Sequence, residues 1–471
     1  MASLDTNIVL IALPTISREL RATSFFDLLW ILLGYQLVNG SLLVNFGRLS
    51  DIFGRVRLFT FGFAVFTFAS ALCSLSQTGE ELIVFRLLQG VGSAFLFSNS
   101  GAIITDAFPE DERGKALGIN QVSIVIGTLM CLVLGGILTG IAGWQSIFYV
   151  NIPIGVFATI WSQYQLKELA VIKKGQKVDT IGNVTFAGGL ALVLLAVTLE
   201  SVSLLGLGEF ILLFGTGVGL LVAFVFVERR SKEPMLDLSL FRIRLFTAGT
   251  IASLLNSLAR GAVILVLTFY LQGPSMGLDA LSAGIFLIPI SVFIALLGPI
   301  SGYLSDKHGP RFFATTGLVV SVVGFLLLAN VGRTVTFWQL AVPLSLVGAG
   351  IGLFQSPNRA SVLSSVPPWA RGTASGTSTT VFIAGASFSL GLAFYILTAG
   401  VPITELQNIF VGGTALSTAP WIGNFVSSIH TVYYLSSLFM LLGILPSVLR
   451  GESKDAKAGA ADPTAQELEL D

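Results

Sequence analysis

The chain is a succession of long apolar runs separated by short polar connections. Thirteen runs reach about 20 residues, the length that a helix needs to cross roughly 30 Å of hydrocarbon. These runs lie near residues 27–46, 57–76, 82–105, 116–140, 144–165, 181–199, 207–227, 245–271, 279–303, 312–331, 336–356, 373–400 and 430–449. A helix satisfies its backbone hydrogen bonds internally, so it can span a bilayer. The pattern therefore predicts an all-α polytopic protein of the cell membrane.

A shorter apolar stretch precedes these runs. Residues 4–14 read as the outer half of a spanning helix, yet only about sixteen residues precede Arg18, fewer than a full span needs. The run at 27–46 must nevertheless enter from the outside if the loops alternate in charge. We therefore predict a fourteenth, truncated first helix and a start codon upstream of Met1.

Two different motifs recur in the same order. The charged turn Gly47–Arg57 (GRLSDIFGRVR) returns roughly 255 residues later as Gly302–Arg311 (GYLSDKHGPR). The segment 99–118 returns as 358–376. Matched positions in this second pair are Asn99 with Asn358, Pro109 with Pro367, Arg113-Gly114 with Arg371-Gly372, and Gly118 with Gly376. Duplicated halves around a central site are typical of secondary transporters.

The repeat predicts four regions along the chain. Residues 1–166 form one six-helix bundle with an incomplete first helix, and residues 244–450 form the other. Residues 167–243 carry two inserted helices between polar loops. Residues 451–471 combine charged with small residues, which predicts a disordered tail.

Charge asymmetry between the loops predicts the orientation. If the Gly47–Arg57 turn is cytoplasmic, strict alternation places every lysine on the cytoplasmic side. Most loop arginines follow, and Arg18, Arg21 and Arg333 lie outside. This is the positive-inside bias of membrane proteins. We therefore expect both termini in the cytoplasm.

Composition argues against a soluble fold and against an enzyme. Hydrophobic residues make up 54% of the chain and charged residues only 11%, compared with about 25% charged in soluble domains. The two histidines, His308 in a loop and His430 at a helix start, provide no metal cluster and no nucleophile–base pair. We expect no cofactor, no metal and no nucleic-acid partner. The expected partners of this monomer are a small-molecule substrate, protons and the lipid bilayer.

The turn at 47–57 carries its own chemistry. Gly47 and Gly54 permit close backbone approach and unusual φ values. Asp51 comes just before the next helix, where a carboxylate suits the positive N-terminal end. Arg55 and Arg57 keep the turn inside. An ordinary positive-inside turn would look similar, but the second copy around Asp306 favours a functional element.

Four motifs, which follow one another along the chain in the family's order, resemble those of the major facilitator superfamily. They are Gly-x-Leu-x-Asp-x-x-Gly-Arg-x-Arg at 47–57, Arg-x-x-Gln-Gly at 86–90, Trp-Gln-x-x-Phe-x-x-Asn-x-Pro-x-Gly at 144–155, and the stretch at 4–14. The last is similar to the first-helix motif of the fourteen-span drug:proton antiporter branch. The resemblance implies two pseudo-symmetric six-helix bundles around a cavity, with two extra helices near residues 181–227.

Arg86 is the candidate for control of proton coupling. An arginine within a span costs roughly 2.5–3.5 kcal/mol on insertion scales and requires a partner or water. Asp5 is the carboxylate at comparable depth in that half. We predict that the two residues approach each other, with Asp5 as the proton carrier. The alternative is a static buried ion pair, and the family's use of these motif positions favours the first interpretation.

The resemblance also implies a gate at the inner side. Its candidate residues are Gly47, Asp51, Gly54, Arg55, Asp106 and Asp306. In the family an acidic residue at the end of the fourth helix, here Asp106, pairs with the arginine that is Arg55 here. Exposed ion pairs contribute only about 0–1 kcal/mol, so the expected role is to bias two states.

The fifth-helix motif of the antiporters is only partly present. Gly127, Gly135 and Gly136 fit it and allow close helix packing, but Cys131 and Leu132 replace the expected Gly-Pro. The missing proline removes a kink. This departure favours a transporter without obligatory antiport.

Polar residues inside other spans are candidates for lining a substrate cavity. They are Tyr35, Gln36, Asn39, Gln89, Asn256, Arg260 and Gln355. Residues of this kind usually face a bundle interior or water. Arg260 lacks a nearby membrane-embedded acid in the sequence. It either binds an anionic or polar substrate group or is hydrated near the cavity rim.

Two functional hypotheses follow. The first is a secondary active transporter that exports hydrophobic or amphipathic compounds by proton-coupled alternating access. The second is a proton-independent facilitator or importer of a polar or anionic metabolite on the same fold, which Arg260 and the altered fifth-helix motif favour.

Overall fold

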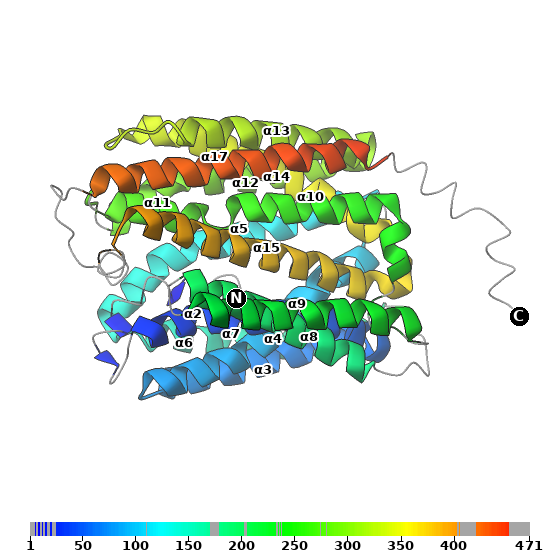
Figure 1. Cartoon of the computed structure of the whole chain (residues 1–471). Helices are drawn as coiled ribbons and strands as arrows, with labels where there is room; N and C mark the ends of the chain where they lie inside the picture. The colour runs from blue at the N-terminus through cyan, green and yellow to red at the C-terminus, as the bar shows by residue number, and fades with distance from the viewer. Residues whose placement is uncertain are drawn as a thin grey trace, which may run out of the picture.

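The computed structural model is a bundle of long helices that run roughly side by side (Figure 1). It describes residues 25–109, 111–169, 179–201, 205–231, 238–273, 275–278, 280–402 and 421–451, with isolated positions at 5, 8, 9, 12, 15, 16, 19, 20, 234, 236 and 405. Among the described residues, ten helices are long and apolar enough to cross a membrane.

The helix order follows the apolar runs. The helices are α2 (Phe25–Phe53), α3 (Arg55–Leu75), α4 (Gly79–Ala107), α5 (Arg113–Ala142), α6 (Ser146–Tyr149), α7 (Asn151–Gln165), α8 (Thr180–Ser201), α9 (Leu207–Arg230), α10 (Arg244–Arg260), α11 (Val263–Gln272), α12 (Ala280–His308), α13 (Pro310–Leu328), α14 (Phe337–Ser364), α15 (Arg371–Gly400) and α17 (Ile422–Leu449). Short 3-10 helices occupy Leu238–Arg242 and Pro368–Ala370. The predicted all-α polytopic architecture is confirmed.

Helix boundaries differ from the sequence prediction at several places. The run at 245–271 is broken between α10 and α11, where Gly261 approaches α15 so closely that a Cβ would lie 2.6 Å from the Ala386 backbone. The run at 144–165 is divided into α6 and α7. The last helix begins at Ile422 rather than near residue 430.

The two charged turns are shorter than the sequence suggested. The helix that carries Asp51 continues to Phe53, and Gly54 alone separates α2 from α3. Gly54 has φ 103°, and Gly309, which separates α12 from α13 in the second copy, has φ 85°. Such values favour glycine. We call the side of the bundle that carries these two glycines the turn face.

Two helix pairs form the most extensive contacts between the N-terminal half (residues 5–169) and the C-terminal half (residues 238–450). The α2 helix packs on α15, and α5 packs on α12. A Cβ on Gly47 would lie 2.5 Å from the carbonyl oxygen of Gly372, and a Cβ on Gly302 would overlap the backbone of Gly114. The repeated glycine therefore brings the halves into backbone contact in both pairs.

The helices between the halves pack against each other and, through α8, against both halves. The α8 helix contacts α9, α2 and α15. Most of α9 is exposed along its length, as expected for a helix that faces lipid. The predicted boundaries at 166, 243 and 450 stay predictions, and the tail from residue 452 lies outside the described residues.

Candidate functional site

The Asp5 carboxylate is fully buried and contacts side chains from two other helices. Its Oδ2 forms an ion pair with Arg86 of α4. Its Oδ1 accepts hydrogen bonds of 2.9 Å from the side-chain amides of Gln89 in α4 and Asn151 at the start of α7. Gln89 also donates to the Ser70 hydroxyl of α3 at 2.8 Å. The cluster therefore connects four segments of the N-terminal half around one carboxyl group.

Arg86 is enclosed by aromatic rings as well as by polar groups. Its Nε donates to the carbonyl oxygen of Ile31 at 3.0 Å, and its Nη1 donates to Gln89 at 2.5 Å. The guanidinium lies 4.3 Å from the centre of the Tyr35 ring and 5.9 Å from that of Phe148. Nη2 is buried and has no hydrogen-bond partner in the described part of the chain. The cation is therefore held by the Asp5 carboxylate, by two neutral oxygen acceptors and by the faces of these rings.

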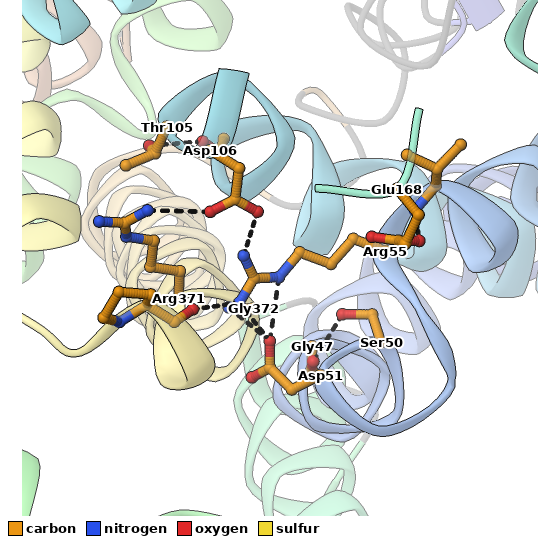
Figure 2. Close-up of polar contacts among 12 residues, drawn as sticks. Gly47, Ser50, Asp51, Arg55, Thr105, Asp106, Glu168, Arg371 and Gly372 are labelled. Carbon is orange, nitrogen blue, oxygen red and sulfur yellow. Dashed lines mark hydrogen bonds and ion pairs between the residues drawn. The ribbon is translucent and has the colours of Figure 1, made fainter. Parts of the chain in front are cut away.

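A second charged cluster lies at the turn face (Figure 2). Arg55 at the start of α3 donates to Asp51 from Nε at 3.0 Å and from Nη2 at 2.7 Å. Its Nη1 forms an ion pair with Asp106 at the end of α4. Asp106 also accepts from Arg371 at 2.9 Å. Arg55 reaches the Pro368 carbonyl oxygen at 2.8 Å. The cluster therefore links α2, α3 and α4 to the C-terminal half.

The Asp51 carboxylate binds the first turn of a different helix from the one that the sequence suggested. Its carboxylate accepts from the backbone N–H groups of Gly372 at 2.9 Å and Thr373 at 2.8 Å, and from the Thr373 hydroxyl at 2.8 Å. These groups open α15, whereas the sequence prediction placed Asp51 at the adjacent α3. The first turn of a helix exposes unpaired N–H groups and positive potential, which suit a carboxylate. Asp51 is therefore an inter-half contact.

Asp306 makes the corresponding contact from the C-terminal half. Its two carboxylate oxygens accept from the backbone N–H groups of Gly114 at 2.9 Å and Lys115 at 3.0 Å, at the start of α5. It does not touch the Arg55 cluster through any described contact. The adjacent Ser356 hydroxyl donates to the Gly114 carbonyl oxygen at 2.9 Å. The gate residues proposed from the sequence therefore form two separate contacts on one face.

Three contributors to these clusters are not among the residues predicted from the sequence. Asn151 completes the Asp5 shell, and Arg371 joins Asp106 across the halves. Glu168, after α7, accepts from the Val56 backbone N–H at 2.9 Å at the start of α3. Asn151 and Arg371 stood in motifs that the sequence displays, so their positions gave a usable signal. Glu168 lies in a connection of ordinary composition and gave none.

The predicted cavity residues separate into distinct environments. Tyr35 donates its hydroxyl to Ser93 at 2.7 Å and belongs with Gln89 to the Arg86 surroundings. Asn39 is buried and Gln36 is half-buried on α2. Asn256 donates to the Met440 sulfur at 3.6 Å within the C-terminal half. The remaining pair, Arg260 of α10 and Gln355 of α14, is joined by a hydrogen bond of 3.0 Å.

The glycines of the partial fifth-helix motif lie in α5. Gly127 is half-buried. The structure describes the backbone of this part of α5 but not the side-chain environment of residues 128–137, which include Cys131, Leu132, Gly135 and Gly136. Their packing role stays a prediction.

A sequence model of the family described as Major Facilitator Superfamily matches residues 1–390, and a second match covers residues 249–467. The chain belongs to the major facilitator superfamily. The second match begins inside α10, as expected if the C-terminal half repeats the N-terminal half. The protein is therefore a multi-pass membrane transporter of small molecules and not an enzyme.

Individual members of the superfamily are similar over most of the chain. The riboflavin transporter RibZ of Clostridioides difficile (strain 630) is 35% identical over 398 residues, covering 84% of each chain. Multidrug resistance protein 3 of Bacillus subtilis (strain 168) is 29% identical over 423 residues, which cover 88% of this chain and 80% of that protein. The crystal structure of the human organic anion transporter MFSD10 (TETRAN) has a TM-score of 0.64 at 14% identity, covering 95% of this chain and 97% of that one. This likeness shows the superfamily fold.

Proposed function

We propose that this superfamily member is a proton-coupled exporter of hydrophobic or amphipathic small molecules in the fourteen-span drug:proton antiporter branch. Similar proteins that are named multidrug resistance proteins support the export function. The turn face lies in the cytoplasm in this proposal, because the lysines gather on that side. The observation that carries the coupling is the buried Asp5 carboxylate, held by Arg86, Gln89 and Asn151.

Protonation of Asp5 would change these contacts at once. A neutral carboxyl group no longer forms an ion pair with Arg86, and Arg86 then stays buried with only neutral partners. An uncompensated buried charge is costly. The helices that carry the two residues would therefore move until Arg86 reaches water, a lipid headgroup or substrate. A proton taken up at Asp5 would thus bias the equilibrium between two conformations.

The turn-face contacts would set the other side of this equilibrium. Asp51 and Asp306 each bind the backbone of the opposite half, and the Arg371–Asp106 ion pair forms a third contact between the halves. Hydrogen bonds to charged groups contribute about 1.5–3 kcal/mol each when they are buried. We infer that the described conformation is closed toward the cytoplasm. Export requires these contacts to open for substrate entry and to re-form before release.

The test uses purified protein in liposomes with an imposed pH gradient and a panel of lipophilic cations, anions and sugars. The proposal predicts gradient-dependent movement of at least one lipophilic compound and its loss in Asp5→Asn. Transport that ignores the gradient and survives Asp5→Asn would overturn the coupling. Asp27→Asn, on the same half but outside the cluster, is the matched control.

A second function is supported by Arg260. No described carboxylate forms an ion pair with this arginine. One of the similar proteins is named as a riboflavin transporter rather than as a multidrug resistance protein. A proton-independent facilitator or importer of a polar or anionic metabolite would use the same fold. Saturable, gradient-independent uptake of such a compound in the liposome assay would favour this second function.

A further inference from the structure

Arg260 and Arg359, in the C-terminal half, form no ion pair with an acidic residue that the structure describes. Arg260, at the end of α10, donates from Nη1 to the Gln355 side-chain oxygen of α14 at 3.0 Å. Its guanidinium also lies 4.9 Å from the centre of the Phe382 ring of α15. Gln355 is a neutral acceptor, so the positive charge is oriented but not neutralised. Arg260 keeps part of its surface exposed.

Arg359 is the second arginine. It lies four residues after Gln355, so the two side chains share one face of α14. Its guanidinium rests against Gly101 of α4 in the N-terminal half, where a Cβ would lie 2.7 Å from Nη2. This Nη2 is buried without a hydrogen-bond partner in the described part of the chain. The missing side chain at Gly101 therefore provides the space that the Arg359 guanidinium occupies between the halves.

The wall beside these arginines is apolar and aromatic. Phe382 and Phe97 both pack on a cluster of Leu43, Ala94 and Ile383, which come from α2, α4 and α15. Phe97 lies one helical turn before Gly101 on α4. A compound placed between the halves here would meet aromatic rings along its body and guanidinium groups at one end.

An anion bound here would neutralise the guanidinium charges of Arg260 and Arg359. Arg55, Arg86 and Arg371 form ion pairs with described carboxylates, whereas Arg260 and Arg359 form none with any carboxylate in the described part of the chain. A charge inside a membrane protein is expensive unless it has a partner, and such residues are typical of substrate pathways. Guanidinium groups bind carboxylates and phosphates with well-defined geometry.

We propose that Arg260, Gln355 and Arg359 form an anion-binding site between the two halves, and that the transported compounds are amphipathic acids with an aromatic body and a carboxylate or phosphate group. Gln355 positions Arg260, and Gly101 positions Arg359. This proposal rests on the transport function proposed above and narrows its substrate class.

The experiment measures equilibrium binding to full-length protein in lipid nanodiscs, with no pH gradient. Three fluorescent probes share one ring system and differ only in charge: 9-anthracenecarboxylate, neutral 9-anthracenecarboxamide and cationic 9-anthracenylmethylammonium. Empty nanodiscs correct for partition into lipid. The site predicts that wild-type protein prefers the carboxylate over the carboxamide by about tenfold or more, the size of one charge-assisted hydrogen bond.

The variants assign the preference to the site. Arg260→Gln and Arg359→Gln should each reduce it to about one-third or less, whereas Arg333→Gln, at an exposed loop arginine, should leave it unchanged. Gly101→Ala should weaken it by displacing the flexible Arg359 side chain, and this small change keeps the helix intact. Size-exclusion elution checks folding. Equal binding of all three probes by wild-type protein, or an unchanged preference in folded Arg260→Gln and Gly101→Ala, would overturn the site.

Binding and coupling fail separately in this design. If liposome transport ignores the pH gradient but the anion preference persists, the site stands and proton coupling falls. If transport follows the gradient but no probe preference exists, coupling stands and the anion site falls.

Discussion

Asp306 repeats at the start of α5 the contact that Asp51 makes at the start of α15. Each carboxylate accepts hydrogen bonds from two consecutive backbone N–H groups of the opposite half. Both follow the same Leu-Ser dipeptide in the two copies of the turn. The duplication has therefore preserved a reciprocal contact in which each half supplies one carboxylate and one helix start.

The two contacts should differ in strength. Asp51 is buried, whereas Asp306 is half-exposed and lacks the hydroxyl donor that Thr373 gives to Asp51. We expect Asp51→Asn to raise the fraction of molecules with an open turn face by about tenfold, which corresponds to the loss of one buried charge-assisted hydrogen bond. Asp306→Asn should raise this fraction less. The measure is the maleimide labelling rate of a cysteine placed at buried Ser375, in a background without Cys73 and Cys131. Equal rates in the wild type and both variants would contradict the gate.

Close backbone approach at Gly47 gives a second prediction. A Cβ at this position would lie 2.5 Å from the Gly372 carbonyl oxygen, so Gly47→Ala should prevent closure of the turn face and abolish transport. Gly215→Ala is the matched control, because a Cβ there meets nothing within 4 Å and the change favours a helix by about 1 kcal/mol. Transport by Gly47→Ala at the wild-type rate would refute the close contact.

The turn glycines predict a difference in stability. Gly54 and Gly309 both have positive φ with extended ψ, which costs of order 1–3 kcal/mol for alanine. At Gly54 a Cβ would also lie 2.7 Å from the Glu168 carboxylate, whereas nothing lies within 4 Å at Gly309. Gly54→Ala should therefore lower the thermal unfolding temperature in detergent more than Gly309→Ala. The reverse order would show that Glu168 does not hold this turn.

A double-mutant cycle tests the Asp5–Arg86 pair. Asp5→Asn leaves a buried guanidinium without its counter-ion and should destabilise the protein by about 3–5 kcal/mol. Arg86→Gln alone should be similarly costly. The double variant should recover part of the stability, as read from thermal unfolding, but not gradient-driven transport. Additive losses in the double variant would mean that the two charges are not coupled.

Much of the fold was predictable because continuous apolar runs leave helices as the only solution in a bilayer. The repeat placed Arg113-Gly114 and Arg371-Gly372 at equivalent positions, which are now seen at the starts of α5 and α15. The contact between Asp5 and Arg86 was also predictable, because Asp5 is the carboxylate at the same membrane depth as Arg86 in that half.

The partners of Asp51 could not be inferred in the same way. A carboxylate near a turn suggests the nearest helix start, and only the packing of α2 on α15 brings residues 372 and 373 beside it. The Arg359 position depends likewise on an absent side chain at Gly101 of another helix. Pair contacts across the halves arise from the fold as a whole, so local patterns do not reveal them.

The most direct test of proton coupling at Asp5 is proton movement driven by substrate alone. Liposomes that contain the protein and a trapped pH-sensitive dye are given an outward or inward gradient of a transported compound, with no initial pH difference. Wild-type protein is predicted to move protons against the substrate flow, and Asp5→Asn is predicted to move none. Proton movement of equal size in Asp5→Asn would contradict the account.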